Sequence, residues 1–158
     1  MAFGSAWLLL LLSCAACTQV LGEIIMRPSC ATGWFYHKSN CYGYFRKMRT
    51  WSDAELECQS HGSGSHLASI LNLKEASVIA QHISSYQKNK SVWIGLHDPQ
   101  QRQRWEWIDG TTYSYNTWAS RSLGGSKYCA ELSARNNFLT WRSRECSKKQ
   151  HFVCKYRP

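Results

Sequence analysis

Eight cysteines restrict the fold of this 158-residue chain more than any other feature, and they fall into two groups. Cys14 and Cys17 lie in an apolar leader, whereas the other six are spread across the rest of the chain. An even number of cysteines in an exported chain predicts a disulfide framework, here with three bridges. The residues alone leave the pairing open, because six cysteines can be joined in many ways. The six are Cys30, Cys41, Cys58, Cys129, Cys146 and Cys154.

Residues 1–22 have the pattern of a secretory signal peptide, although no Lys or Arg precedes the apolar stretch as it usually does. That stretch, AWLLLLLSCAAC, is shorter than the roughly 20 apolar residues of a membrane span. Val20 and Gly22 allow cleavage before Glu23, and cleavage after Cys17 is the alternative. A signal anchor is the other interpretation of the leader. We expect a secreted, extracellular protein without a transmembrane segment, in which residues 23–158 form the mature domain.

The mature residues predict one α+β domain. They contain no Cys-x-x-Cys pair, which argues against a thioredoxin-type redox site or a zinc site. They carry too many large aromatic rings for a disordered chain, and they are numerous enough to bury a core. No Pro-rich or Gly-rich linker divides them, so a second domain is not expected.

The beginning of the domain predicts two strands followed by a helix. Residues 34–45 are rich in aromatics and are typical of two short strands with a turn at Ser39–Asn40. Thr50 or Ser52 can cap the helix, and Ser52 with Glu55 fits a capping box. Helical spacing places three residues on the inward face, namely Trp51, Ala54 and Cys58.

A short strand and a second helix follow. Residues 61–65 (HGSGS) end the first helix, and residues 67–71 read as a short apolar strand. Asn72 with Glu75 fits another capping box, which opens a helix that ends near Ser84. The expected inward residues of this helix are Ala76, Ile79, Ala80 and Ile83.

The second half of the domain predicts strands separated by polar loops. The loop 109–127 is too long for a hairpin turn, and long loops in compact domains are often functional. The expected strands are residues 92–96, 105–108, 128–132, 138–141 and 151–156.

Several segments resemble the C-type lectin-like domain when they are taken in order. They are Cys41-Tyr42, TWSDAELECQ, HLASI, WIGL, WEWIDG, CAEL and Trp141…Cys146…FVCKY, and they cover residues 30–156. Within that superfamily, CYGYFRK, WIGLHDP and QHFVCKY resemble the regenerating (Reg) family of small secreted proteins. The resemblance implies two helices packed on short antiparallel sheets, with a long-loop region and a core that contains Trp51, Trp93, Leu96 and Trp107. It also implies the disulfides Cys30–Cys41, Cys58–Cys154 and Cys129–Cys146.

The resemblance raises the question of a calcium site. Lectins of this superfamily that bind sugar through Ca²⁺ carry Glu-Pro-Asn or Gln-Pro-Asp in the long loop and Trp-Asn-Asp further on. Here those positions hold Ser122-Leu123-Gly124 and Trp141-Arg142-Ser143, and the Glu-Pro-Asn that some Reg relatives carry is also missing from residues 100–104. Ca²⁺ needs about six to eight oxygen ligands, several of them carboxylates. We therefore expect no metal ion and no other cofactor.

Two polar clusters are candidates for sugar binding without a metal. Amide groups both donate and accept hydrogen bonds, and the Arg guanidinium donates through a planar fork, which suits vicinal hydroxyls. The resemblance places both clusters at the ligand-facing end, and the alternative is that they are ordinary solvated turns. The clusters are Asp98, Pro99, Gln100, Gln101, Arg102 and Gln103, and Arg135, Asn136 and Asn137.

The chain has a formal net charge of +9, and most of the excess lies after residue 98. A basic set near the C-terminus is a candidate site for acidic polysaccharides such as heparin, in a salt-sensitive mode. The alternative is charge that serves only solubility. Nucleic acid fits less well because no nucleic-acid motif is present. The set is Arg142, Arg144, Lys148, Lys149, Lys155 and Arg157, and Asn89-Lys90-Ser91 is a glycosylation sequon.

Together these features predict a secreted, calcium-independent lectin for mannose-type glycans such as mannan, and for acidic polysaccharides. Its contacts do not depend on a bound ion, so we expect it to remain active at acid pH. The Reg resemblance implies a setting in gastrointestinal epithelial or mucosal inflammatory and regenerative responses. The alternatives are a growth-factor-like ligand of a cell-surface receptor and a cationic antimicrobial protein. An enzyme is not expected, because the six His lie in no catalytic motif and Gly-x-Ser-x-Gly is absent.

Overall fold

The structure is a computed structural model that describes residues 29–120 and 123–158. The expected signal peptide and its cleavage site lie outside the described residues. Within them, no helix is long and apolar enough to cross a membrane. The elements are β1 (Phe35–His37), β2 (Asn40–Arg49), α2 (Trp51–Gln59), β3 (His66–Leu67), α3 (Leu73–Ser84), β4 (Val92–His97), β5 (Glu106–Trp107), β6 (Cys129–Leu132), the 3-10 helix η1 (Ala134–Asn136), β7 (Trp141–Arg144) and β8 (Gln150–Tyr156).

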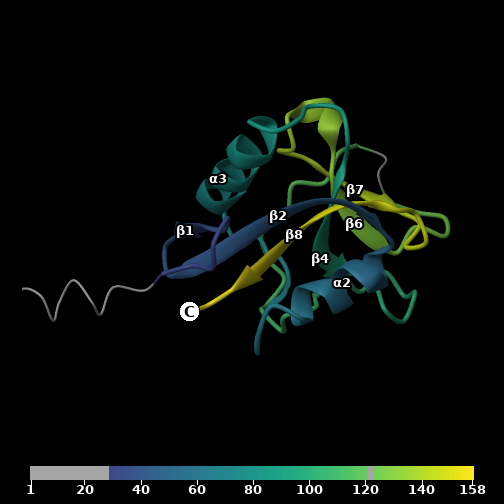
Figure 1. Ribbon diagram of the computed structural model, residues 1–158. Coiled ribbons are helices and arrows are strands. Elements are labelled where there is room, and N and C mark those ends of the chain that lie inside the picture. The colour runs from purple at the N-terminus through teal and green to yellow at the C-terminus, as the bar shows by residue number, and fades with distance from the viewer. Residues whose placement is uncertain (1–28, 121–122) are drawn as a thin grey trace, which may run out of the picture.

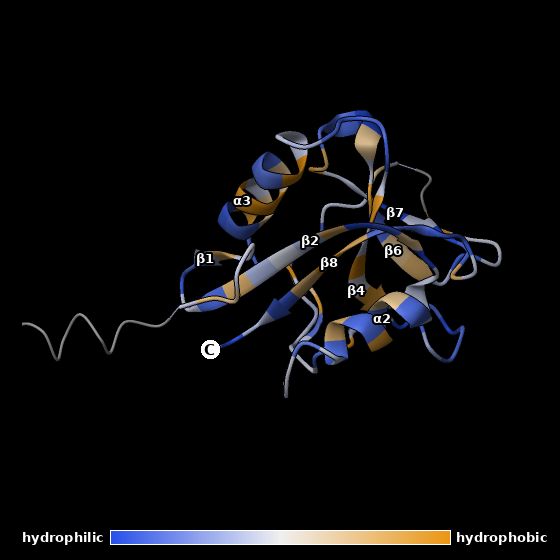
Figure 2. Cartoon of the chain, viewed as in Figure 1, coloured by the Kyte–Doolittle hydropathy of each residue, from blue (hydrophilic) through white to orange (hydrophobic). Residues whose placement is uncertain are grey.

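The strands form one mixed sheet in the order β1-β2-β8-β4-β6-β7, with β3 beside β8 and β5 beside β4. Helices α3 and α2 lie on opposite sides of the β2–β8 pair (Figure 1). The apolar residues of α3 face the sheet (Figure 2), and they join one core cluster while α2 joins another. The expected α+β fold with two helices is confirmed. One detail differs, because β4 and β8 pair in parallel and the sheet is therefore not purely antiparallel.

Helix α2 begins after Thr50, one of the two expected caps, but the expected capping box of Ser52 with Glu55 does not form. The Thr50 hydroxyl accepts a hydrogen bond from the Asp53 amide at 3.2 Å, which makes Thr50 the N-cap. Glu55, the expected partner of Ser52, turns away from the helix start. Its carboxylate accepts hydrogen bonds from the Leu67 amide at 2.8 Å and bonds the His66 ring at 2.7 Å. Glu55 therefore fixes β3 to α2 instead of capping the helix.

Helix α3 follows the prediction closely. Asn72 caps it by accepting a hydrogen bond from the Glu75 amide at 2.8 Å. The Glu75 carboxylate accepts a hydrogen bond from the Leu71 amide at 2.7 Å, one residue before the cap. The four residues expected on the inward face are all buried, namely Ala76, Ile79, Ala80 and Ile83.

Three predicted boundaries are wrong, and each error has a local cause. The β1–β2 turn centres on Lys38–Ser39, where both residues have positive φ as a tight hairpin turn requires. Strand β3 is only His66–Leu67, and the apolar residues after it are buried without extending the strand. The strand expected at 138–141 begins instead at Trp141, because Phe138 adopts a φ of 63° and lies buried in the preceding turn.

The three disulfides pair as the resemblance implies, Cys30–Cys41, Cys58–Cys154 and Cys129–Cys146. The second bridge joins α2 to β8, whose centre lies between β2 and β4. The Trp51 indole donates a hydrogen bond to the Ile94 carbonyl at 2.8 Å and so fixes α2 to β4 as well. The other three expected core residues, Trp93, Leu96 and Trp107, are also buried.

Candidate functional site

The loop 98–103 leaves the sheet at the end of β4 and is held in shape by Asp98. The Asp98 side chain is 3% exposed, and its two oxygens accept hydrogen bonds from the amides of Arg102 at 3.1 Å and Gln103 at 2.7 Å. Gln101 and Gln103 both have positive φ, so the loop turns tightly around the carboxylate. Asp98 therefore positions the loop, while the glutamines after it are exposed.

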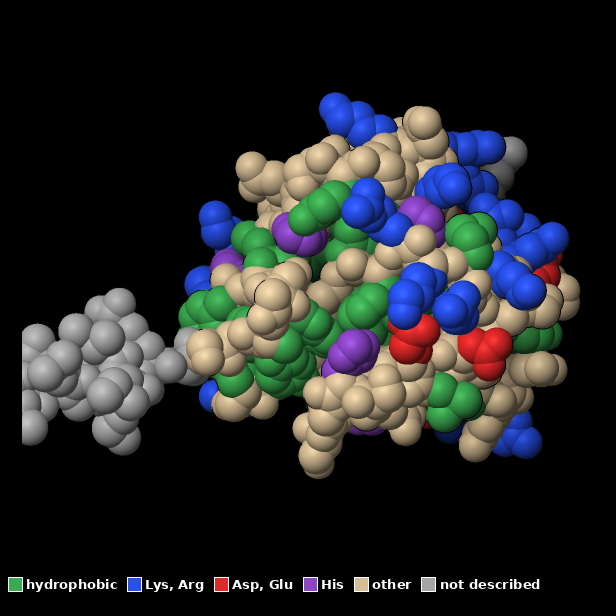
Figure 3. Space-filling view, viewed as in Figure 1, with side chains coloured by type: hydrophobic (Ala, Val, Ile, Leu, Met, Phe, Trp, Pro, Cys, Tyr) green, Lys and Arg blue, Asp and Glu red, His purple; other side chains and the backbone are tan. Residues whose placement is uncertain are grey.

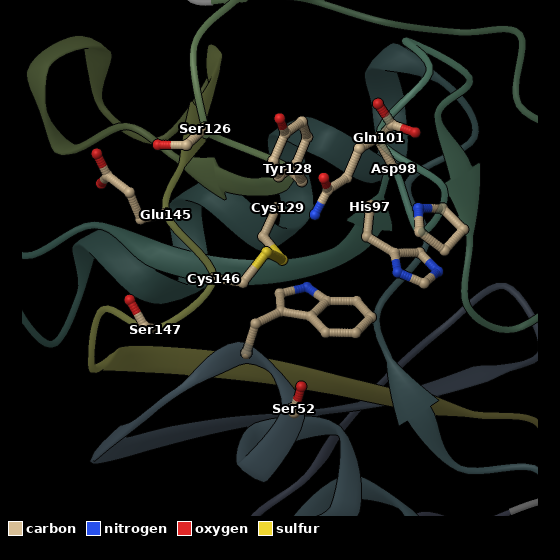
Figure 4. A pocket seen from close by; sticks show the side chains of 12 residues that line it. Ser52, His97, Asp98, Gln101, Ser126, Tyr128, Cys129, Glu145, Cys146 and Ser147 are labelled. Carbon is tan, nitrogen blue, oxygen red and sulfur yellow. A yellow bond between two sulfur atoms is a disulfide. The ribbon is translucent and has the colours of Figure 1, made fainter.

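Gln101 borders a hollow of about 480 Å³, which we name the Gln101 hollow. In Figure 4 the Cys129–Cys146 disulfide lies between two groups of polar side chains, with Gln101, Tyr128 and His97 on one side and Glu145, Ser126 and Ser147 on the other. Hydroxyl, amide, carboxylate and aromatic groups thus converge on one surface, as a sugar site requires. The lining residues are Trp51, Ser52, His97, Asp98, Pro99, Gln101, Ser126, Tyr128, Cys129, Glu145, Cys146 and Ser147.

His97, which lines the Gln101 hollow, is harder to protonate than a free histidine. Its ring stacks on Trp51 with centroids 4.4 Å apart. Burial lowers the pKa of His97, against the opposite influence of nearby carboxylates led by Glu106. Since the folded state favours the neutral ring, His97 favours folding above its usual titration range. That contribution is lost as the pH falls from about 6.5, where the unfolded histidine gains its proton, to the lowered pKa of the folded state.

A second hollow of about 340 Å³ adjoins the first, and Gln101, Asp98 and Tyr128 border both. Trp105 also lines it, and the ring of Trp105 lies against Trp118 with centroids 4.8 Å apart. Gln103 and Lys127 add polar groups to its rim. The two hollows form one candidate surface around Gln101, which reaches from the disulfide to the long loop.

The cluster 135–137 does not join this surface, so the expectation of a shared end is wrong. Strand β6 runs antiparallel to β4, with Leu132 opposite Val92 and Cys129 opposite His97. Residues after Leu132 therefore lie at the start of β4, whereas loop 98–103 lies at its end, about 20 Å away at roughly 3.3 Å per residue. Figure 1 shows η1 at the top of the molecule, near α3 and away from α2.

The cluster 135–137 forms a small surface of its own beside α3. Asn137 adopts a left-handed φ of 52°, and with Gln81 and Leu139 it borders a shallow hollow of about 240 Å³. Arg135, Asn136 and Asn137 are all exposed. If both clusters bind sugar, they form two sites that act separately.

Two of the three acids between residues 109 and 145 already have partners in the protein. Asp109 accepts hydrogen bonds from the hydroxyls of Ser69 and Thr111. Glu131 is fully buried and accepts a hydrogen bond from Arg144. Residues 29–120 and 123–158 contain no group of three His, Cys, Asp or Glu arranged to hold a metal ion. Of the positions compared with the calcium motifs, Ser122 lies outside these residues.

The basic set near the C-terminus is not one patch. Lys155 is only 9% exposed, and its ammonium donates hydrogen bonds to Glu75, the Ser69 hydroxyl and the Ser69 carbonyl at 3.0–3.1 Å. Its inclusion in a glycan-binding surface is therefore wrong, because β8 is an inner strand and Lys155 points into the core. Arg157 follows the far end of β8, more than about 20 Å from Lys149. Of the other members, Arg142 and Arg144 lie on β7, and Lys148 and Lys149 lie in the turn that joins β7 to β8.

Five residues that border the Gln101 hollow were not among the predicted site residues, namely His97, Ser126, Tyr128, Glu145 and Ser147. Three of them carry a usable signal. Tyr128 directly precedes Cys129, and Glu145 and Ser147 flank Cys146, so the disulfide brings them together. Once the cysteine pairing is known, the side chains next to the bridged cysteines of a long-loop region can therefore be identified as candidate site residues.

The comparisons with known proteins agree with this geometry. The Lectin C-type domain family matches residues 47–156. Human regenerating islet-derived protein 4 is 71% identical over 158 residues, which is 100% of both chains. A solved variant of the human regenerating gene type IV protein is 71% identical, with a TM-score of 0.67 over 83% of this chain and 100% of that chain. Human lithostathine is 35% identical, with a TM-score of 0.79 over 84% of this chain and 94% of that chain. The chain therefore belongs to the C-type lectin domain family and, within it, to the regenerating proteins.

Proposed function

We propose that this protein is a secreted lectin that binds mannose-type glycans such as mannan without calcium. The observation that carries the proposal is Gln101, whose exposed amide lies between two adjoining hollows lined by hydroxyls and aromatic rings. Amides can bond vicinal sugar hydroxyls in pairs, and aromatic rings such as Tyr128 and Trp105 can pack against the apolar face of a pyranose. The cluster 135–137 is a second, independent site in this proposal.

Calcium independence is supported by the carboxylates, which already accept hydrogen bonds within the protein. Asp98 accepts them from amides of its own loop, Asp109 from the hydroxyls of Ser69 and Thr111, and Glu131 from Arg144. Taking these oxygens for a metal would leave their present donors without partners, which costs about 1–3 kcal/mol for each buried group. Arg142 also places a positive charge at a position where calcium-binding lectins supply an oxygen.

Direct hydrogen bonds of this kind give weak monovalent binding. Each contributes about 0.5–1.5 kcal/mol, so a few bonds correspond to a Kd in the millimolar range, near −4 kcal/mol. Strong binding then requires a polymer that engages several sites at once. The two separated clusters would allow one polysaccharide chain to contact the protein twice.

Replacing Gln101 with glycine should abolish the NMR shifts that mannan causes around the Gln101 hollow. Glycine accepts the positive φ at this position, so the substitution removes the amide without straining the loop. The measurement is an NMR titration with mannan in EDTA, at neutral and at acid pH. Gln100→Ala is the matched control, because Gln100 is exposed and borders neither hollow. Binding that appears only after Ca²⁺ is added, or that survives Gln101→Gly unchanged at this surface, would reject the assignment.

The proposal includes acidic polysaccharides such as heparin, through the basic residues of β7 and of the turn that joins β7 to β8. Figure 3 shows Lys and Arg side chains gathered on the side where β6 and β7 lie in Figure 1. Arg142→Ala with Lys148→Ala should lower the salt concentration at which the protein elutes from heparin, because exposed charges act through screened attraction. Unchanged elution would remove these residues from the site. Arg144 is left intact in this test because it partners the buried Glu131.

The proposed setting is the mucosal surface of the gastrointestinal epithelium, in inflammatory or regenerative responses. Binding there is proposed to occur without catalysis. Asn89 is exposed in the loop before β4, so its sequon is accessible for glycosylation. Leakage of anionic vesicles, or binding to a cell-surface receptor that excess mannan does not compete away, would instead favour the antimicrobial or signalling alternatives.

A further inference from the structure

A further hollow, of about 200 Å³, lies on the α3 side of the sheet where β2 departs from regular pairing with β8. Phe45 pairs with Phe152 and Arg49 with Gln150, so four residue steps on β2 face two on β8. The extra residues bulge around His151, as inserted residues do in an antiparallel pair. We name this the His151 hollow, and it is lined by Met48, Lys90, Ser91, Lys149, Gln150 and His151.

Two cations line the His151 hollow, and a third, Arg46, lies close enough to influence His151 without lining the hollow. Lys90 and Lys149 line it directly, from the loop before β4 and from the turn before β8. Arg46 comes from the β2 bulge, and its guanidinium lies over the Tyr86 ring at 4.9 Å. Lys90, Lys149 and Arg46 are all exposed, and no acid is among the lining residues. Such a concentration of one charge around a depression attracts anions.

A chain of hydrogen bonds holds one wall of this hollow in place. The Gln87 amide nitrogen donates to the Tyr44 hydroxyl at 2.8 Å and to the Lys90 carbonyl at 2.9 Å, and its oxygen accepts from the Lys90 amide at 2.8 Å. The Tyr44 hydroxyl lies 2.8 Å from His151 Nδ1. The Tyr44 hydroxyl accepts the bond from Gln87, and its own hydrogen is available to His151 Nδ1 when the neutral ring carries its hydrogen on Nε2.

We infer that the His151 hollow binds a sulfate or carboxylate group of an acidic polysaccharide, with Arg46, Lys90 and Lys149 supplying the charge. The inference rests on the proposed binding of acidic polysaccharides. It assigns that binding to Arg46, Lys90 and His151, which lie outside the basic set near the C-terminus. Cations from three segments can approach one anion from different sides, whereas an open patch of lysines attracts it without orienting it.

Binding in this hollow should be coupled to the proton on His151. Burial, followed by Lys90 and Arg46, lowers the pKa of His151 in the free protein. A bound anion opposes the repulsion from these two cations, so the pKa rises and affinity increases as the pH falls through the range of His151. The other groups at this wall are Tyr44, Tyr86, Gln87 and Lys149.

The test is titration of the full mature protein, deglycosylated at Asn89, with a heparin octasaccharide. Arg46→Gln with Lys90→Gln should weaken binding about tenfold or more at roughly 0.15 M salt, since two charge-assisted contacts are lost. Lys38→Gln with Lys74→Gln removes the same charge from exposed lysines elsewhere and should stay within about twofold. In the wild type, the NMR pKa of the His151 ring should rise on binding, and His151→Gln should flatten the pH dependence of Kd.

The outcomes separate this inference from the broader proposal. If the wild type binds the octasaccharide and both double variants bind equally well, the His151 hollow is not the site, while the proposal of acidic-polysaccharide binding stands. The same conclusion holds if the pKa of His151 does not move on saturation. If the wild type fails to bind even at low salt, the acidic-polysaccharide proposal falls together with the inference.

Discussion

Replacing Lys155 with alanine is expected to destabilise the domain by about 3–5 kcal/mol, because it leaves a buried carboxylate without its cation. Glu75 is 6% exposed and accepts hydrogen bonds from the Lys155 ammonium, the Tyr42 hydroxyl and the Leu71 amide. Burial, followed by the hydrogen bond to this carboxylate, raises the pKa of Tyr42 well above its usual range. Urea unfolding with the disulfides intact, monitored by tryptophan fluorescence, measures the loss.

Two further variants make this result specific. Lys149→Ala removes an exposed lysine from the same strand region and should change the free energy of unfolding by less than about 0.5 kcal/mol. Lys155→Met with Glu75→Gln removes both charges and should recover part of the stability, because an uncompensated charge no longer remains in the core. A loss below about 1 kcal/mol for Lys155→Ala would mean that water reaches Glu75 and that the pair is not truly buried.

Removing the Cys58–Cys154 disulfide by changing both residues to alanine is expected to cost about 4–5 kcal/mol. The bridge closes 96 residues of sequence, and it joins α2 to β8 across the second core cluster. The longer the closed loop, the more conformations the cross-link removes from the unfolded chain. Urea unfolding of the variant at neutral pH, compared with the wild type, gives the difference.

The Cys30–Cys41 bridge provides the matched comparison. It closes only 11 residues, so Cys30→Ala with Cys41→Ala should cost about 3 kcal/mol. The expected order of stability is therefore wild type, then the variant without the short bridge, then the variant without the long one. The reverse order of the two variants would show that native packing around the cysteines outweighs the effect on the unfolded chain.

Local features of the structure were largely predictable from the sequence. Thr50 and Asn72 cap their helices by accepting a hydrogen bond from a backbone amide only three residues further along the chain, so the cap depends on nearby sequence alone. The inward face of α3 follows from helical spacing, which is a property of neighbouring residues. The boundary at Phe138 was not predictable in this way, because its apolar pattern fits a strand as well as the buried turn that it forms.

The candidate site was only partly predictable, for a different reason. Loop 98–103 was identified from its polar composition, but its partners Tyr128 and Glu145 come from segments that the Cys129–Cys146 bridge brings to it. The expectation that loop 98–103 and residues 135–137 lie at the same end of the sheet was wrong. Their relative position depends on the directions of the strands that they follow. The antiparallel register of β4 and β6 places the two clusters at opposite ends.

The residues themselves were enough to predict a disulfide-bonded α+β domain, since cysteine count, helix caps and apolar spacing are local properties, and the order of its segments showed the resemblance to the C-type lectin-like domain. Sheet position decided the rest. Lys155 looks like one more surface charge among the basic residues near the C-terminus, yet it lies on an inner strand facing α3 and meets Glu75 there. His151, two positions from Val153 on the same strand, borders a hollow only because β2 bulges opposite it. Whether a charged residue stabilises the core or meets a ligand depends on which strand lies beside it, and that information is not local.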